Sequence, residues 1–259
     1  MIKVRAAVSR KIRSALVISA ALTALSGCSI GLEDLGGRVQ GHVWEEFASG
    51  EIGGADIARD LKFGSVSAQP EIDGAMNIWR NRLEVDWSKF DRTENGTARS
   101  NFQFAGQNVP FSSQITTHVN ADVIRGTYGF VIGPKLFSAT PLIGGAWIAQ
   151  DTTVVGTGQP TILTGVPAAA VPVNGEAKDS QPFPVAGLRL ESVPLSWLDF
   201  EGQVSGFGIP GGEIVDAKAM MGARYYHLRA DAGYRYLRFD FGDTHIRIKG
   251  LMFGGGFYF

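Results

Sequence analysis

The chain has 259 residues, of which 44% are apolar and 19% charged, and its mean hydropathy is +0.04. These values are too polar for a bundle of membrane-spanning helices and too apolar for a disordered chain. Thirty-four glycines, set against one cysteine and four histidines, favour short glycine-punctuated strands over a disulfide scaffold or a Cys/His metal cluster. We therefore expect no metal and no cofactor.

The formal net charge of −1 conceals an uneven distribution. Residues 1–27 contain five basic residues and no acidic one, so removing them from the 24 basic residues leaves 19 against 25 acidic residues. A processed chain would then carry a net charge near −6. This balance gives no electrostatic reason to expect a nucleic-acid partner.

The N-terminus has the pattern of a targeting segment. Residues 1–13 are basic, and residues 14–25 form an apolar core that matches a signal sequence and is too short to span a bilayer. We expect residues 1–27 to be removed as a signal peptide and residues 28–38 to form a linker.

The signal segment ends in Leu25-Ser26-Gly27-Cys28, which resembles the lipobox of bacterial lipoproteins. The resemblance implies cleavage before Cys28 and lipid modification of that cysteine, whose acyl chains would hold it at a membrane. The next residue is Ser29 and not the aspartate that usually retains lipoproteins at the inner membrane, which implies the outer membrane. The alternative is an ordinary signal peptide that is cut elsewhere.

The rest of the chain alternates with period two. In residues 82–89 the polar Arg82, Glu84 and Asp86 oppose apolar neighbours, and residues 197–207 repeat the pattern. No stretch shows a sustained helical period. The chain is therefore predicted to be all-β.

Ten strands are predicted, and their connections differ in length. The strands lie near residues 39–47, 71–79, 82–91, 115–131, 135–150, 183–192, 197–207, 215–227, 230–241 and 244–259. The links after the even-numbered strands are short, whereas residues 48–70, 92–114 and 151–182 form long loops. This asymmetry is typical of a transmembrane antiparallel up-and-down β-barrel with its short turns in the periplasm.

We assign the barrel to residues 39–259, with both chain ends in the periplasm. An alternative barrel of eight strands would leave residues 39–47 and the Pro141-interrupted run at 135–150 outside the wall.

The C-terminus supports a membrane barrel. The chain ends in Phe257-Tyr258-Phe259 on an alternating strand, which resembles the signal read by the bacterial barrel-assembly machinery. Phe257 and Phe259 are the expected assembly signal, and this machinery and outer-membrane lipid are the expected partners.

A barrel of this size has a lumen that side chains nearly fill. Since the apolar faces of the strands would meet lipid, the charged faces are predicted to form a lumen network of Arg82, Glu84, Asp86, Arg189, Glu191, Asp199, Glu201, Lys218, Arg224 and Arg235. Near Arg125 and Lys249, strict alternation would put charge on the lipid face, so we expect a bulge or a membrane boundary there.

Aromatic residues near the strand ends are predicted to form interfacial girdles. They are Trp44, Trp79, Trp87, Trp147, Trp197, Tyr225, Tyr226, Tyr234, Tyr236 and Tyr258.

Several motifs together resemble the small outer-membrane β-barrel proteins of Gram-negative bacteria. They are VWE at 43–45, DIARDLKF at 56–63, FQFAGQ at 102–107, PFPVAGLR at 182–189 and GYRYLRFD at 233–240. The resemblance spans nearly all of the mature chain and implies fold and location. It implies little about activity, because this family is mostly uncharacterised.

No catalytic motif stands out, so we expect no catalytic residue and no enzyme. Neither His42 nor His118 begins a His-x-Ser pair, and the nearest approach to a His-Asp pair is His245 with Asp240 and Asp243. The leading hypothesis is a non-enzymatic outer-membrane barrel with a charged, largely plugged lumen and long outer loops that have a structural role or bind an extracellular ligand. The alternatives are a narrow channel and a lipid-modifying or protease-like barrel enzyme.

Overall fold

The computed structural model describes residues 35–52, 54–98, 101–134, 136–158, 171–209, 212–241 and 244–259. The predicted signal peptide and Cys28 lie outside these described residues. Among the described residues, no helix is long and apolar enough to cross a membrane.

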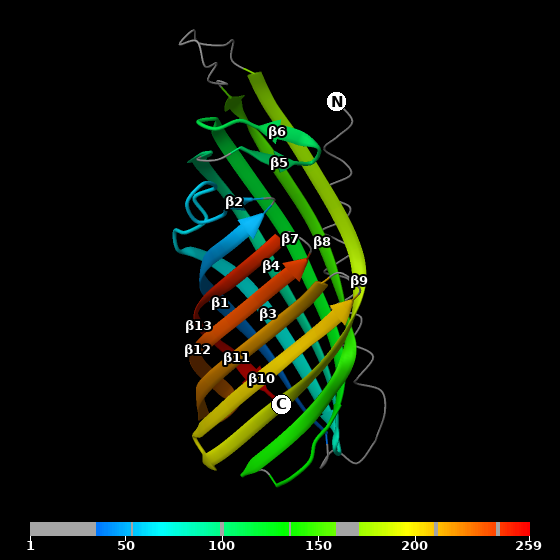
Figure 1. Ribbon diagram of the computed structural model, residues 1–259. Coiled ribbons are helices and arrows are strands. Elements are labelled where there is room, and N and C mark those ends of the chain that lie inside the picture. The colour runs from blue at the N-terminus through cyan, green and yellow to red at the C-terminus, as the bar shows by residue number, and fades with distance from the viewer. Residues whose placement is uncertain are drawn as a thin grey trace, which may run out of the picture. The chain divides into compact units, whose positions relative to one another are not determined.

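Ten long antiparallel strands form a closed barrel (Figure 1). The last strand pairs with the first from Arg38↔Tyr258 to Ile52↔Thr244, which closes the wall. The strands are β1 (Leu35–Ile52), β3 (Ser67–Ile78), β4 (Asn81–Thr97), β7 (Gln114–Phe130), β8 (Phe137–Gly158), β9 (Val171–Leu195), β10 (Leu198–Ile209), β11 (Gly212–Tyr225), β12 (Leu228–Phe241) and β13 (Thr244–Tyr258). The predicted all-β barrel of ten strands is confirmed, and the alternative of eight strands is wrong.

The eight-strand alternative left out residues 39–47, which lie within β1, and the run interrupted by Pro141, which lies within β8. Regular pairing of β8 with β7 stops at Leu142↔Gly129, whereas pairing with β9 continues through Pro141↔Leu188. The proline therefore lies at the end of one ladder, where the missing N–H donor is tolerated.

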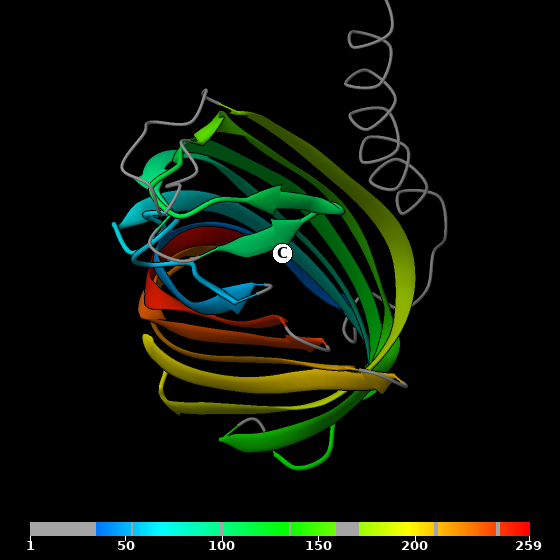
Figure 2. The same ribbon diagram turned by 45° about the horizontal axis from the view of Figure 1, so that its top comes forward.

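The two ends of the barrel differ. Turns of two residues join β3 to β4, β9 to β10 and β11 to β12 at one end, which we call the short-turn end. The opposite loop end carries β2 (Ala55–Asp56), paired with β1, and a hairpin of β5 (Phe102–Phe104) and β6 (Gln107–Val109). These small elements, which were not predicted, lie across the loop end (Figure 2).

The strands extend further toward the loop end than the sequence predicts. β1 begins inside the predicted linker, and β8 and β9 have 22 and 25 residues, so they occupy much of the predicted loop at 151–182. Main-chain pairing between β8 and β9 is continuous from Phe137↔Ser192 to Gly158↔Val171. Most of the predicted loop at 151–182 therefore consists of the ends of two paired strands.

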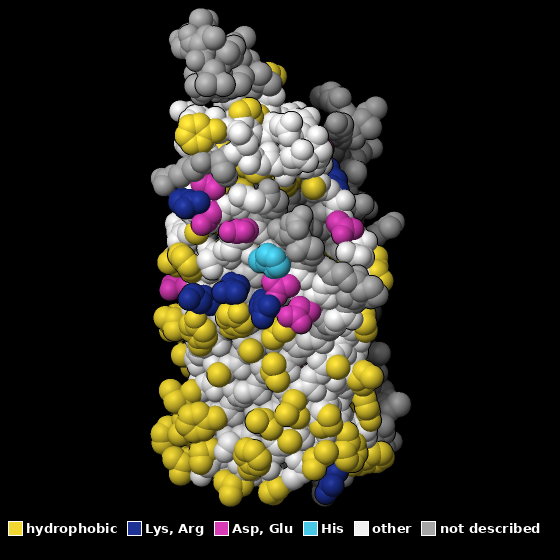
Figure 3. All heavy atoms as spheres, viewed as in Figure 1, with side chains coloured by type: hydrophobic (Ala, Val, Ile, Leu, Met, Phe, Trp, Pro, Cys, Tyr) yellow, Lys and Arg dark blue, Asp and Glu magenta, His cyan; other side chains and the backbone are white. Residues whose placement is uncertain are grey.

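The outer face is apolar in the half of the barrel near the short-turn end. Its exposed side chains include Val39, Val43, Leu83, Val85, Ile124, Ile143, Leu188, Leu190, Val204, Met221, Leu251 and Phe253. On the face visible in Figure 3, apolar side chains cover the lower part, and a belt of charged side chains lies above them. On β13 the outer face changes from apolar to charged between the exposed residues Leu251 and Lys249.

Aromatic side chains gather at the short-turn end, where Trp79, Phe130, Phe137, Trp197, Tyr225, Tyr226, Phe257 and Phe259 are exposed. Two residues predicted to belong to the girdles, Trp44 and Tyr258, face the lumen instead. Trp44 is 5% exposed and faces the lumen, where the Arg235 guanidinium lies 4.7 Å from its ring centre. Tyr258 carries the Arg224 guanidinium on its ring at 4.6 Å. Both rings pack against an inward-facing arginine because they occupy the inner face of their strands.

The two residues of the expected assembly signal lie beside the seam between β1 and β13. The Phe257 ring is stacked on the His227 ring, with centres 5.5 Å apart. The main chain of Phe259 exchanges hydrogen bonds with Gly37, at 2.8 and 3.0 Å. Both ends of the barrel segment therefore lie at the short-turn end.

Candidate functional site: a charged plug beneath an apolar chamber

The ten residues expected in the lumen all lie on the inner face of the wall. Eight of them are buried, namely Arg82, Glu84, Asp86, Arg189, Asp199, Glu201, Lys218 and Arg235. Glu191 and Arg224 are 22% and 30% exposed, close to the ends of β9 and β11 at the short-turn end.

Eight further titratable residues belong to the same cluster and were missed from the sequence. They are Arg38, His42, Glu71, Asp73, Arg125, Asp216, Arg229 and Asp231, and all are buried. Most of them stand two residues from another inward polar residue, so the alternation that revealed the first ten contained the signal for these as well. We call the combined set of residues the charged plug.

Arg125 corrects the expected register on β7. Its side chain points into the lumen, and the pairing of β7 with β4 and β8 runs through Arg125 without a shift. Arg125 appeared to face lipid because Val123, two residues before it, is an inward-facing apolar residue that lines the upper lumen.

The layer nearest the short-turn end is built around Asp199 and Glu201 on β10. Asp199 accepts hydrogen bonds from Arg224 and Arg229, each at 2.5 Å. Glu201 is bonded to Arg38 at 2.7 Å and also pairs with Arg189. These contacts connect β10 to β1, β9, β11 and β12.

The next contacts connect β4 to β9 across the lumen. Arg189 donates to Glu84 at 2.6 Å, and Arg82 donates to Glu191 at 2.8 Å. Arg82 also lies 2.5 Å from Glu84 on its own strand. Arg82 therefore bridges two carboxylates, and Arg189, which also pairs with Glu191 and Glu201, bridges three.

His42 links β1 to the neighbouring strand β3 on one side and, beyond β13, to β12 on the other. Its Nδ1 lies 3.2 Å from Asp73 on β3, and its Nε2 lies 3.1 Å from Asp231 on β12. A carboxylate this close to each ring nitrogen favours the protonated imidazolium, which is the form with an N–H on both nitrogens and a positive charge. We therefore treat His42 as a cation of the plug.

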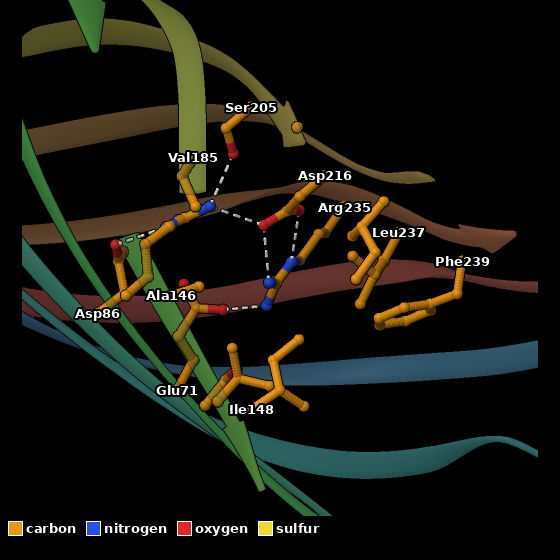
Figure 4. A pocket seen from close by; sticks show the side chains of 15 residues that line it. Glu71, Asp86, Ala146, Ile148, Val185, Ser205, Asp216, Arg235, Leu237 and Phe239 are labelled. Atoms are coloured by element: carbon orange, nitrogen blue, oxygen red, sulfur yellow. Dashed lines mark hydrogen bonds and ion pairs between the residues drawn. The ribbon is translucent and has the colours of Figure 1, made fainter. Parts of the chain in front are cut away.

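The layer nearest the loop end is shown in Figure 4, around a small cavity of about 60 Å³. Asp216 accepts from Arg125 at 3.0 Å and from Arg235 at 2.9 Å. Glu71 on β3 pairs with Arg235 and accepts from Lys218 at 3.0 Å. Opposite sides of the wall are joined directly, because these partners belong to β3, β7, β11 and β12.

Every carboxylate of the plug has at least two cationic partners within 4.0 Å. Nine carboxylates face eight arginine and lysine side chains, and the imidazolium of His42 makes the two signs equal. A buried charge is costly unless it is paired, so this balance allows the cluster to remain ionised inside the wall.

Above the plug the lumen is apolar. A cavity of about 500 Å³ is lined by side chains from both the wall and the loop end, including Trp44, Phe63, Phe90, Phe104, Val119, Phe183, Ile214, Leu237 and Phe239. Glu71 and Arg235 border both this cavity and the smaller one, so they form the floor of the larger. We call the larger cavity the chamber.

The chamber is covered by the small elements of the loop end. Ile57, Leu61 and Phe63 follow β2 and are at most 5% exposed, and Phe102 at the start of β5 is 6% exposed. Their apolar side chains face inward and join the hydrophobic cluster of Trp44, Ile248 and Met252 on the wall. Burial of these side chains holds the segments over the end of the barrel.

A group suited by its residue types to a metal lies within the plug. His42, Glu71 and Asp73 have ligand atoms within 4.8 Å of one another. Glu71, however, is already paired with Lys218 and Arg235, and Asp73 with Arg38. The chain's own cations occupy the positions that a metal ion would need, so we assign these residues to the plug.

The histidine pair considered for catalysis lies elsewhere. His245 Nδ1 is 2.9 Å from Asp240 Oδ1, and both residues face outward from neighbouring strands, away from the chamber. Asp243 lies outside the described residues. Within the described residues this pair has no access to the chamber, where a substrate could be enclosed.

Comparison with known proteins identifies the fold. No protein-family model and no curated protein sequence matches the chain. Among solved structures it is similar to the outer membrane protease OmpT from Escherichia coli, with a TM-score of 0.54 and 10% identity, covering 90% of this chain and 98% of that one. It also matches the translocator domain of autotransporter NalP from Neisseria meningitidis, with a TM-score of 0.45 and 10% identity, covering 96% and 97%.

A further match is Ail, the attachment invasion locus protein of Yersinia pestis, with a TM-score of 0.39 and 10% identity, covering 88% and 99%. These structural neighbours are Gram-negative outer-membrane β-barrel proteins. At such identity, the likeness to OmpT shows the fold alone.

Proposed function

We propose that the protein is a non-enzymatic β-barrel of the bacterial outer membrane whose lumen is closed by the charged plug and whose loop end interacts with the surroundings of the cell. The observation that carries the closed lumen is the double pairing of every carboxylate in the plug. A permeating ion would have to replace several of these short contacts at once, and no wide aqueous path is expected in a barrel of this size.

The exterior supports the proposed location. The apolar outer face near the short-turn end, bordered by aromatic side chains, matches the lipid-facing band of outer-membrane barrels. Both ends of the barrel segment lie at the short-turn end, which is the periplasmic end in our proposal. Acylation of Cys28 would anchor the N-terminus to the same membrane.

The loop end supplies the proposed interaction surface. The hairpin of β8 and β9 is the longest in the barrel and carries exposed polar side chains, among them Glu176 and Lys178. On intact cells, an amine reagent that does not cross membranes should label Lys178, as mapped by mass spectrometry. Labelling of Lys178 only after cell lysis would contradict the proposed orientation.

Conductance across planar lipid bilayers tests the closed lumen. The purified, folded full chain should give at most small and rare openings, and Glu201→Gln should leave this result unchanged because Arg38 and Arg189 retain other carboxylates. Steady single-channel openings of the wild type, with ion selectivity that shifts in Glu201→Gln, would show instead that the protein is a narrow channel.

A further inference from the structure

The chamber has the properties of a ligand site. Its volume of about 500 Å³ falls within the range of ~300–1,000 Å³ that is usual for small-molecule sites, which are lined mainly by apolar and aromatic side chains. Its lining fits this description, with Phe90, Phe104, Phe183 and Phe239 placed around it.

Two polar groups in the chamber lack partners. The indole Nε1–H of Trp44 and the hydroxyl of Thr117 are buried, and among the described residues neither makes a hydrogen bond. Both residues line the chamber. Buried donors usually find an acceptor, because leaving one unpaired is costly. An oxygen atom of a ligand would supply that acceptor.

The charges of the lining indicate a neutral ligand. Four charged residues border the chamber, namely Glu71, Arg235, Lys89 and Asp179, and their formal charges cancel. Arg235 is occupied by Asp216, Glu71 and the Trp44 ring, and Lys89 by Asp91. A ligand carboxylate would therefore find no free cation at the floor and would have to lose its hydration without compensation.

We propose that the chamber binds a neutral amphiphile, a molecule with an apolar chain or ring system and one hydroxyl or carbonyl oxygen that accepts a hydrogen bond from Trp44. This site goes beyond the proposed closed barrel, although Glu71 and Arg235 of the plug form its floor. Binding would stop at that floor, so the site retains its ligand and does not conduct it.

Fluorescence of Trp44 offers a direct test. The other four tryptophans, Trp79, Trp87, Trp147 and Trp197, lie on the outer face, so replacing them by phenylalanine leaves Trp44 as the single reporter inside the lumen. The probe is 2-bromo-1-undecanol, whose bromine lies on the carbon next to the hydroxyl-bearing carbon and therefore quenches the indole that binds the hydroxyl; it is added to the full-length protein in phosphatidylcholine vesicles. Quenching should saturate, and unbrominated 1-undecanol should reverse it.

Matched variants separate the chamber from the bilayer. Ala121 on β7 lines the chamber. Ala149 on the neighbouring strand β8 is paired with Asp122, the residue after Ala121, and faces outward. In the single-tryptophan background, Ala121→Phe should weaken binding by about tenfold or more by occupying the space of the ligand, and Ala149→Phe should change it by less than about twofold. If Ala121→Phe does not fold, Val119→Phe fills the chamber from the same face.

The remaining arms test the chemistry and the source of the ligand. The carboxylate analogue, 2-bromoundecanoate, should bind at least about tenfold more weakly than the alcohol. Quenching that rises without saturation, equally in Ala121→Phe and Ala149→Phe, would overturn the site, and equal binding of the carboxylate would overturn the neutral class. The source of the ligand is tested by denaturing protein purified from cells. Release of a neutral lipid that is absent from Ala121→Phe would identify the cell's own membrane as the source. Binding of the alcohol by protein that carries no lipid would identify an external source.

Conductance measurements remain a separate test of the closed lumen, so failure of the ligand site and failure of the closed lumen can be told apart.

Discussion

Every carboxylate of the charged plug has at least two cationic partners. We therefore predict that the stability of the barrel depends on whether two removed cations share the same carboxylate. Asp86 is held by Arg125 at 3.0 Å and by Lys218 at 3.5 Å. In Lys218→Met, Asp86 keeps Arg125 and Glu71 keeps Arg235. In Arg125→Met, Asp86 keeps Lys218 and Asp216 keeps Arg235. Each single variant removes contacts without leaving a carboxylate unpaired, so we expect each to lower the free energy of unfolding by about 1.5–3 kcal/mol.

The double variant Arg125→Met/Lys218→Met should cost more than the sum of its parts. Asp86 then has no cation within contact distance, and an orphaned buried charge costs on the order of 3–5 kcal/mol. The carboxylate can escape this cost by taking up a proton, which at pH 7 requires about 4 kcal/mol for a group with the ordinary aspartate pKa of about 3.9. The expected excess over additivity is therefore about 3–4 kcal/mol at pH 7. At pH 5 protonation costs only about 1.5 kcal/mol, so the excess should shrink to about that value.

A second double variant provides the control. Arg82→Met/Lys218→Met also removes two buried cations, but Glu84 keeps Arg189, and Glu191 keeps Arg38 and Arg189. No carboxylate is orphaned, so the two effects should add within about 0.5 kcal/mol. Urea unfolding in lipid vesicles, followed by tryptophan fluorescence, measures the six proteins that the comparison needs. They are the wild type, the single variants Arg125→Met, Lys218→Met and Arg82→Met, and the two double variants. Equal coupling energies in the two double variants, or an excess that does not fall at pH 5, would refute the reasoning.

Three further predictions concern other parts of the chain. Mass spectrometry of the mature N-terminus should find an acylated Cys28, and this mass should disappear in Cys28→Ala; an unmodified N-terminus downstream of Cys28 would contradict it. Deletion of Phe259 should lower outer-membrane levels and increase periplasmic degradation with signal processing intact, whereas normal levels would exclude an assembly role. A Cβ added at Gly254 would lie 2.2 Å from the His42 ring, so Gly254→Ala should destabilise the barrel by about 1–3 kcal/mol. Gly41→Ala, where a Cβ meets nothing within 4 Å, should be nearly neutral in the same unfolding assay, and similar losses in both variants would contradict the packing argument.

The fold followed from sequence because period-two alternation is strong where one face of the wall is charged and the other apolar. Residues 82–86 of β4 show this clearly, since inward Arg82, Glu84 and Asp86 oppose outward Leu83 and Val85. In such a segment the register is unambiguous, because a slip by one residue would expose every charge on the outer face. The same pattern explains how part of the charged plug could be predicted.

The chamber could not be predicted in this way. Further along β4, Phe90 faces inward, and on β7 the inward Val119 and Val123 precede the inward Arg125. Where the inner face is apolar, neighbouring polar side chains face outward, so the same alternation appears with its phase reversed. A single sequence does not say where along the strand the reversal occurs, and the segments beyond it were assigned to loops or suspected of carrying a bulge.

The apolar and charged faces of the wall exchange sides along the barrel, and each arrangement matches a different surrounding solvent. Near the short-turn end the wall is apolar outside and charged inside, and near the loop end the inward Leu237 and Phe239 of β12 oppose the outward Arg238 and Asp240. The loop-end half thus has the distribution of a water-soluble β-barrel with an apolar interior, and the other half has that of a membrane barrel. Because every strand passes from one half to the other, an apolar chamber and a charged plug must meet where the exterior changes from lipid-facing to polar. The floor formed by Glu71 and Arg235 is that meeting point, so the same side chains that close the lumen also limit the depth of the chamber.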